Sequence, residues 1–99
     1  MTILLAWVLW EQMQLWSPLK ELERNEWVIY FGTDTRAECN AALEAAWKIK
    51  LDGITPMAKS QGSTITASLG SIVLVTPNGS QVSTTFRCIP DTIDPRSPK

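Results

Sequence analysis

The residues of this chain that could do chemistry are its two cysteines and a charged cluster near the C-terminus. Cys39 lies near the start of a predicted helix, and Cys88 closes a predicted strand. Asp91, Asp94 and Arg96 follow at once, in a segment that two prolines stiffen. Carboxylates in such a cluster can bind a hard cation or act as an acid–base pair. These residues could therefore support thiol chemistry, cation binding or acid–base catalysis.

The cysteine pair fits a structural role better than a reactive one. Its spacing is far from the Cys-x-x-Cys of redox motifs, and the chain has no histidine and no further cysteine to complete a zinc site. A disulfide between Cys39 and Cys88 would join the helix to the last strand, as in many small secreted domains. The alternatives are two buried free thiols in a cytosolic protein, or a reactive Cys39 in the first turn of the helix.

The charged residues of the tail also have a structural interpretation. Because the chain contains no histidine, the commonest general base and metal ligand is missing. We expect Asp91 and Asp94 to cap turns, and Arg96 to pair with a carboxylate or with carbonyl groups at a sheet edge. An enzyme or metal-binding protein that uses these three residues is the alternative. We expect no catalytic residue, no metal ligand and no cofactor.

Composition indicates one small globular domain. The chain has 99 residues, of which 44% are hydrophobic and 19% charged, and its net charge is −1. Such a composition argues against disorder, and the absence of a basic surface argues against a nucleic-acid partner. The apolar segment from Ile3 to Trp10 is too short to span a bilayer and lacks the basic flank of a signal peptide. We therefore expect no membrane span.

The pattern of the chain predicts an α+β fold in the order β-β-α-β-β. The expected architecture is a small antiparallel sheet of four to five strands with one helix packed on one face. Residues 1–90 would form this domain, and residues 91–99 an extended tail. Leu19–Asn25 is expected to be a short polar link. The expected strands are Ile3–Gln12, Glu26–Phe31, Ser71–Thr76 and Gln81–Cys88, with a possible fifth at Ser63–Ala67.

The helix has a clear predicted start. Thr35 suits the N-cap, and Glu38 completes a capping box. We expect the helix to end near Leu51, because Gly53 suits the position after a helix and Pro56 disfavours continuation. Residues 56–62 would then form a loop. Apolar residues recur every fourth position along the predicted helix: Cys39, Leu43 and Trp47.

Two segments could carry a binding surface. Trp10 and Trp16 border polar residues, so they are candidates for an exposed binding patch, whereas the other three tryptophans lie on predicted core faces. The hairpin from Ser71 to Cys88 has no charged residue before Arg87, so its edges would lack charges that oppose association. A homodimer through this hairpin is therefore an alternative to a different protein partner.

The C-terminal run CIPDTIDPRSPK, residues 88–99, resembles the C-terminus of a group of short, uncharacterised bacterial proteins. The Trp-rich segment 6–10 is similar to their first strand. Residues 31–39 loosely match their helix start, an aromatic residue followed by Thr or Ser and then Glu-Cys. Proteins of this group usually begin with a signal peptide, and this chain shows no complete one.

The resemblance implies a periplasmic or secreted protein with paired cysteines and no assigned activity. Together with the missing catalytic residues, it favours an exported, disulfide-stapled module with a non-catalytic binding or structural role. Its partner would be another protein or a second copy of the chain, bound through a sheet edge or through the patch at Trp10 and Trp16.

Overall fold

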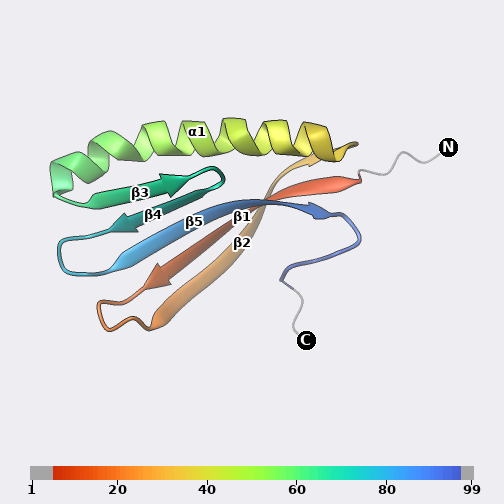
Figure 1. Ribbon diagram of the computed structural model, residues 1–99. Helices are drawn as coiled ribbons and strands as arrows, with labels where there is room; N and C mark the ends of the chain where they lie inside the picture. Colours follow the sequence, from red (N-terminus) through yellow and green to blue (C-terminus); the bar gives the residue numbers. More distant parts are fainter. Residues whose placement is uncertain (1–5, 97–99) are drawn as a thin grey trace.

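The computed structural model describes residues 6–96, which form an antiparallel five-stranded sheet and one helix (Figure 1). The strand order in the sheet is β2-β1-β5-β4-β3. The predicted α+β class is therefore confirmed, and the possible fifth strand is present as β3. The elements are β1 (Trp7–Trp16), β2 (Leu22–Thr33), α1 (Arg36–Gln61), β3 (Thr64–Ser68), β4 (Ser71–Val75) and β5 (Gln81–Pro90).

Strands from opposite ends of the chain meet in the middle of the sheet. β1 pairs with β5 along its whole length, from Trp7 opposite Pro90 to Trp16 opposite Gln81. β1 also pairs with β2, and β5 with β4. The edges of the sheet are therefore β2 on one side and the short β3 on the other.

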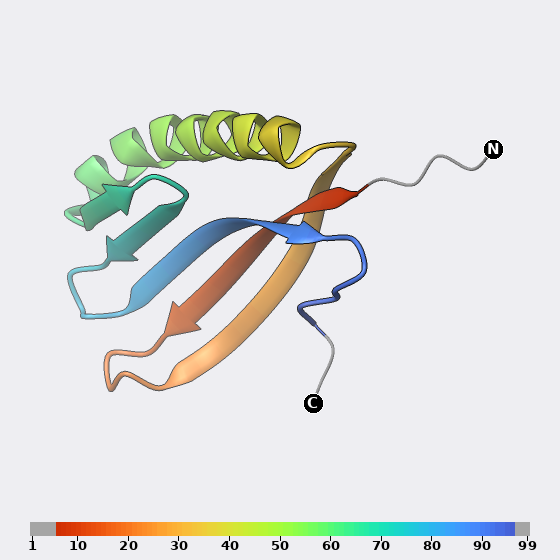
Figure 2. The ribbon, with the colours of Figure 1, turned by 45° about the vertical axis from the view of Figure 1, so that its right-hand side comes forward.

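The helix lies along one face of the sheet: its first turns lie near the end of β2 and over β1 and β5, and its later turns lie over β4 and β3 (Figures 1 and 2). The hairpin of β1 and β2 leads away from it, so the far half of that hairpin has no second layer. The core is accordingly small, and it gathers where the helix crosses β1 and β5. Its buried members are Leu9, Cys39, Ala46 and Phe86, with Trp7, Leu43, Trp47 and Cys88 packed around them.

The helix is longer than its local sequence signals predict. It runs for 26 residues and ends at Gly62, whose φ of 73° is the left-handed conformation typical of a helix end. The N–H of Gly62 donates to the carbonyl of Lys59, and that of Ser63 to the carbonyl of Ala58. The predicted end near Leu51 and the predicted loop over 56–62 are therefore wrong.

Packing of the last two helical turns explains the difference. Ala58 is only 1% exposed. Pro56 stands inside the helix and cannot donate to the carbonyl of residue 52. The hydroxyl of Thr55 donates to the carbonyl of Leu51 at 2.6 Å, which provides one local bond beside this gap. Burial at the end of the helix thus outweighs the local preference to stop at Gly53 or Pro56.

The first hairpin is also longer than predicted. The segment expected as a polar link is instead a tight turn followed by β2, which begins at Leu22 and continues through Gly32 to Thr33. The Ser17 hydroxyl accepts the N–H groups of Leu19 and Glu21 and so closes the turn. Pairing with β1 holds Leu22 and the polar residues 23–26 extended. β1 itself ends at Trp16, and residues 3–5 of its expected start lie outside the described region.

Candidate interaction site at the edge of the sheet

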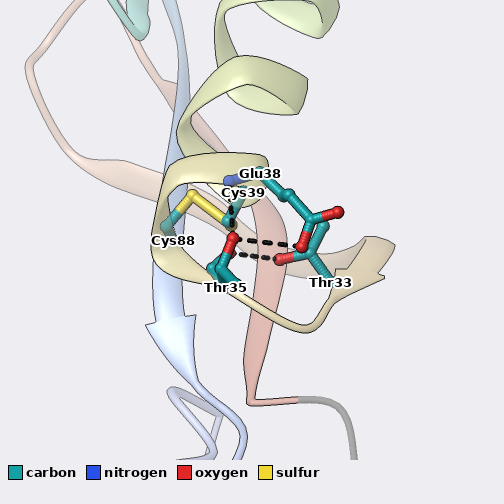
Figure 3. The surroundings of a disulfide bond; sticks show 5 residues. All are labelled: Thr33, Thr35, Glu38, Cys39 and Cys88. Atoms are coloured by element: carbon teal, nitrogen blue, oxygen red, sulfur yellow. Dashed lines mark hydrogen bonds between the residues drawn. A yellow bond between two sulfur atoms is a disulfide. The ribbon is translucent and has the colours of Figure 1, made fainter.

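The two cysteines form a disulfide between the first turn of α1 and β5, with their Cα atoms 6.0 Å apart (Figure 3). Cys39 is fully buried. This confirms the structural interpretation of the pair. Because both thiols are consumed, the alternatives of free or reactive cysteines are not supported.

Hydrogen bonds beside the disulfide fix the end of β2 to the start of the helix (Figure 3). The Thr35 hydroxyl accepts the N–H of Glu38 at 3.1 Å and donates to its carboxylate at 3.0 Å. The Thr33 hydroxyl donates to the carbonyl of Thr35 at 2.9 Å. The predicted N-cap at Thr35 is therefore confirmed, with the Glu38 carboxylate bonded to the Thr35 hydroxyl rather than to the Thr35 backbone N–H of a full capping box. The Thr33 bond anchors the end of β2 to the start of α1, which the disulfide joins to β5.

Residues 91–96 fold back as a C-terminal strap. The carboxylate of Asp94 accepts two hydrogen bonds from the Arg96 guanidinium, each 3.0 Å long, and a third from the Arg96 backbone N–H at 2.9 Å. These bonds lower the pKa of Asp94 and raise the pKa of Arg96. The backbone N–H of Asp91 donates to the carbonyl of Ala6, which ties the strap to the start of β1.

The strap reaches Trp10, and the prediction of an exposed patch is wrong for this residue. The Arg96 guanidinium lies over the Trp10 ring, 5.0 Å from its centroid, and the Trp27 ring contacts Trp10 edge-on at 6.3 Å. Trp10 is only 3% exposed as a result. Trp16 is half-buried and lines a hollow with the turn residues Pro18 and Gly79. The two tryptophans therefore do not form a joint exposed surface.

The helix-side face of the sheet contains an ion pair and an apolar hollow. Glu11 is 8% exposed, and its carboxylate lies 3.4 Å from the ammonium group of Lys50 on the helix. Beside this pair, a hollow of about 250 Å³ opens between α1 and the sheet. Its apolar lining includes Met13, Ile54, Met57, Leu74 and Val82.

The most unusual surface is the apolar run of β2, residues 28–31. Val28 is 52% exposed, Ile29 56%, Tyr30 49% and Phe31 55%. These consecutive residues belong to an edge strand, whose outer N–H and C=O groups have no strand partner in the described region. Soluble proteins usually protect such an edge with charges, prolines or a covering segment. The apolar run of β2 has none of these within it.

The register places this run on both faces of the sheet. Ile29 is opposite Trp10 and so faces away from the helix, whereas Phe31 is opposite Leu9 and lies on the helix side. Between them the pairing shifts at a β-bulge, which leaves Tyr30 without a partner on β1. The Tyr30 ring meets Phe86 edge-on at 5.7 Å and thus also lies on the helix side. A strand added at β2 would meet apolar side chains on either face.

Comparison with family models, curated proteins and solved structures found no match. Within residues 6–96 there is no group of three acidic or cysteine side chains placed to hold a metal ion. Helix α1 lacks an apolar stretch long enough to cross a membrane. The apolar run of β2 thus has to be interpreted from its own geometry.

The open edges of the sheet are not the edge that the sequence predicted. β4 and β5 are paired on both sides, so the predicted hairpin from Ser71 to Cys88 has no edge open to a second copy. The short edge strand β3 displays mainly Thr and Ser. A signal for this candidate site was present in the five consecutive apolar residues 27–31, but only the sheet order shows that they lie at an edge.

Proposed function

We propose that this protein is an exported, disulfide-stabilised binding module without catalytic activity, and that it binds through the outer edge of β2. One observation carries the proposal: four consecutive apolar residues, each about half exposed, lie on a long edge strand. Exposed apolar surface of this kind marks interaction sites in soluble proteins. Where no partner covers such an edge strand, the strand promotes aggregation.

The chemistry of such a site is strand addition. A partner strand would bond to the outward N–H and C=O groups of β2, which supplies affinity for any extended chain. Val28 and Phe31 on one face and Ile29 on the other would select apolar side chains in the partner. The binding site would be rigid, since the Thr33 hydrogen bond and the disulfide hold the end of β2. Rigidity lowers the entropy that binding must overcome.

Export is supported by the disulfide, because such bonds persist in oxidising compartments. The resemblance of residues 88–99 to the C-terminus of short exported bacterial proteins supports the same compartment. The native location would be the periplasm or the exterior of a bacterial cell. Alkylation of native protein followed by mass spectrometry tests the disulfide on which this argument rests: two alkylated thiols before reduction would remove its support.

A peptide-display selection tests the binding site. The bait is the folded protein, immobilised at low density. We expect enriched peptides to be extended and rich in apolar β-branched residues, and to lose binding when Val28→Lys and Ile29→Lys are combined. The matched control is Ile49→Lys, which changes an isolated isoleucine on the helix that is 72% exposed. Peptides that bind the double variant as well as the parent would place the binding surface elsewhere.

A further inference from the structure

We infer that the strand added at β2 is the β2 strand of a second copy of this chain, paired antiparallel about a two-fold axis at Ile29. The inference rests on the proposed function and names its partner. The two sheets would then continue into one another across the axis. A dimer of this kind is isologous, so each residue of one β2 meets its counterpart in reverse order. The strand must therefore be complementary to itself when read backwards.

The apolar residues meet this requirement when the axis passes beside Ile29. Ile29 then faces Ile29 of the second copy on the face away from the helix. On the helix side, Val28 falls opposite the Tyr30–Phe31 pair, which the bulge directs to that same side. Pairs of aromatic and β-branched side chains stabilise neighbouring antiparallel strands. All four half-exposed apolar side chains would be covered in one step.

Trp27 and Gly32 provide a second match. Trp27 lies opposite Gln12 and Gly32 opposite Val8, so both are on the face away from the helix. With the axis at Ile29 and the bulged Tyr30 passed over, Trp27 falls beside Gly32 of the second copy. An aromatic ring over an edge glycine covers backbone that the glycine leaves bare. The bulge therefore fits this register.

The polar residues around the apolar run bring no like charges together in this register. With Tyr30 passed over, Asn25 of each copy falls beside Asp34 of the other, and Glu26 beside Thr33. In the single chain Glu26 already pairs with Arg24 at 2.6 Å. The segments that flank the apolar run therefore do not oppose the pairing.

Neighbouring registers are less favourable. An axis at Val28 would place the carboxylate of Glu26 against the ring of Tyr30. An axis at Tyr30 would place Ile29, which faces away from the helix, opposite Phe31 on the helix side, so these two side chains could not pack together. Self-complementarity of the apolar run thus selects one register, and it favours a second copy over an unrelated strand.

Light scattering on the purified chain tests the dimer. We expect the mass of a dimer at micromolar concentrations, and the mass of a monomer for Ile29→Lys, because the axis would bring two ammonium groups side by side. The matched control is Thr66→Lys on the opposite edge strand β3, also exposed, which should remain a dimer. Circular dichroism shows whether each variant is folded. A parent chain that stays monomeric, or a dimer that survives Ile29→Lys, overturns the inference.

A cysteine placed on the axis gives an independent readout. Cα atoms of directly opposed residues in antiparallel strands lie about 4.5–5.5 Å apart, within the range that a disulfide bridges. Ile29→Cys should therefore form a covalent dimer on oxidation, whereas Asn25→Cys, further along the same strand, should not. Equal cross-linking at both positions contradicts pairing about Ile29.

The outcomes separate this inference from the proposed function. If the parent chain is monomeric but selected peptides still require Val28 and Ile29, the second copy is excluded and the binding edge stands. If the chain dimerises and the Val28 and Ile29 changes affect neither dimer nor peptide, both proposals fail.

Discussion

Removal of the disulfide should lower the free energy of unfolding by about 4 kcal/mol. The bond joins residues 49 apart in sequence. In the chain-entropy model, loss of a disulfide that closes a loop of this length raises the entropy of the unfolded chain and so stabilises the unfolded state by about 4 kcal/mol. Since domains of this size are stable by about 5–15 kcal/mol, the loss would take a large share of the total. The corresponding fall in melting temperature is about 20 °C.

The measurement is urea unfolding of a Cys39→Ala, Cys88→Ala double variant, followed by tryptophan fluorescence. The free energy of unfolding falls linearly with urea concentration, and extrapolation to zero urea gives its value in water for the variant and the parent. Reduced and alkylated parent protein is the control, because it loses the same bond without a change of residue. A loss below about 1 kcal/mol in both proteins would refute the loop-closure argument.

Three further predictions concern the helix, the strap and the buried ion pair. Pro56→Ala should raise the free energy of unfolding by about 1–2 kcal/mol, because the restored helix N–H outweighs the greater freedom that alanine gives the unfolded chain. An unchanged urea midpoint contradicts this. Asp94 has a lowered pKa in the fold, so its stabilisation is complete above the unfolded pKa and is lost as pH falls through the folded pKa. Melting temperatures between pH 7 and pH 3 should therefore fall more steeply for the parent than for Asp94→Asn, and equal slopes would show that the strap is not held by Asp94. Lys50→Met should cost about 1–3 kcal/mol in urea unfolding by leaving the buried carboxylate of Glu11 without its cation, and Glu11→Gln should recover part of that loss.

Local sequence signals predicted the parts of the fold that depend on near neighbours. The start of the helix follows from Thr35 as N-cap with Glu38 three residues on, and the structure has the Thr35 cap. The end of the helix could not be predicted in this way. Gly53 and Pro56 are genuine local stop signals, but the burial of Ala58 at the end of the helix outweighs them.

The candidate site depends on contacts between distant segments, which local patterns do not contain. Trp10 and its polar neighbours suggested exposure, yet a strap from the other end of the chain covers the ring. The run 28–31 was expected to form a strand and does. That its residues are half exposed follows from the position of β2 at the edge of the sheet, and strand order is a property of the whole chain.

The central pairing of β1 with β5 has a consequence for how this protein is made. While the chain is being synthesised, β1 lacks one of its two neighbours until residues 81–90 have emerged. The core around Leu9 and Phe86 cannot close before then, and neither can the disulfide. Folding should therefore begin late and involve contacts between distant residues, which makes it slow. A chain that stays open until its last strand is complete can be threaded across a membrane before it folds.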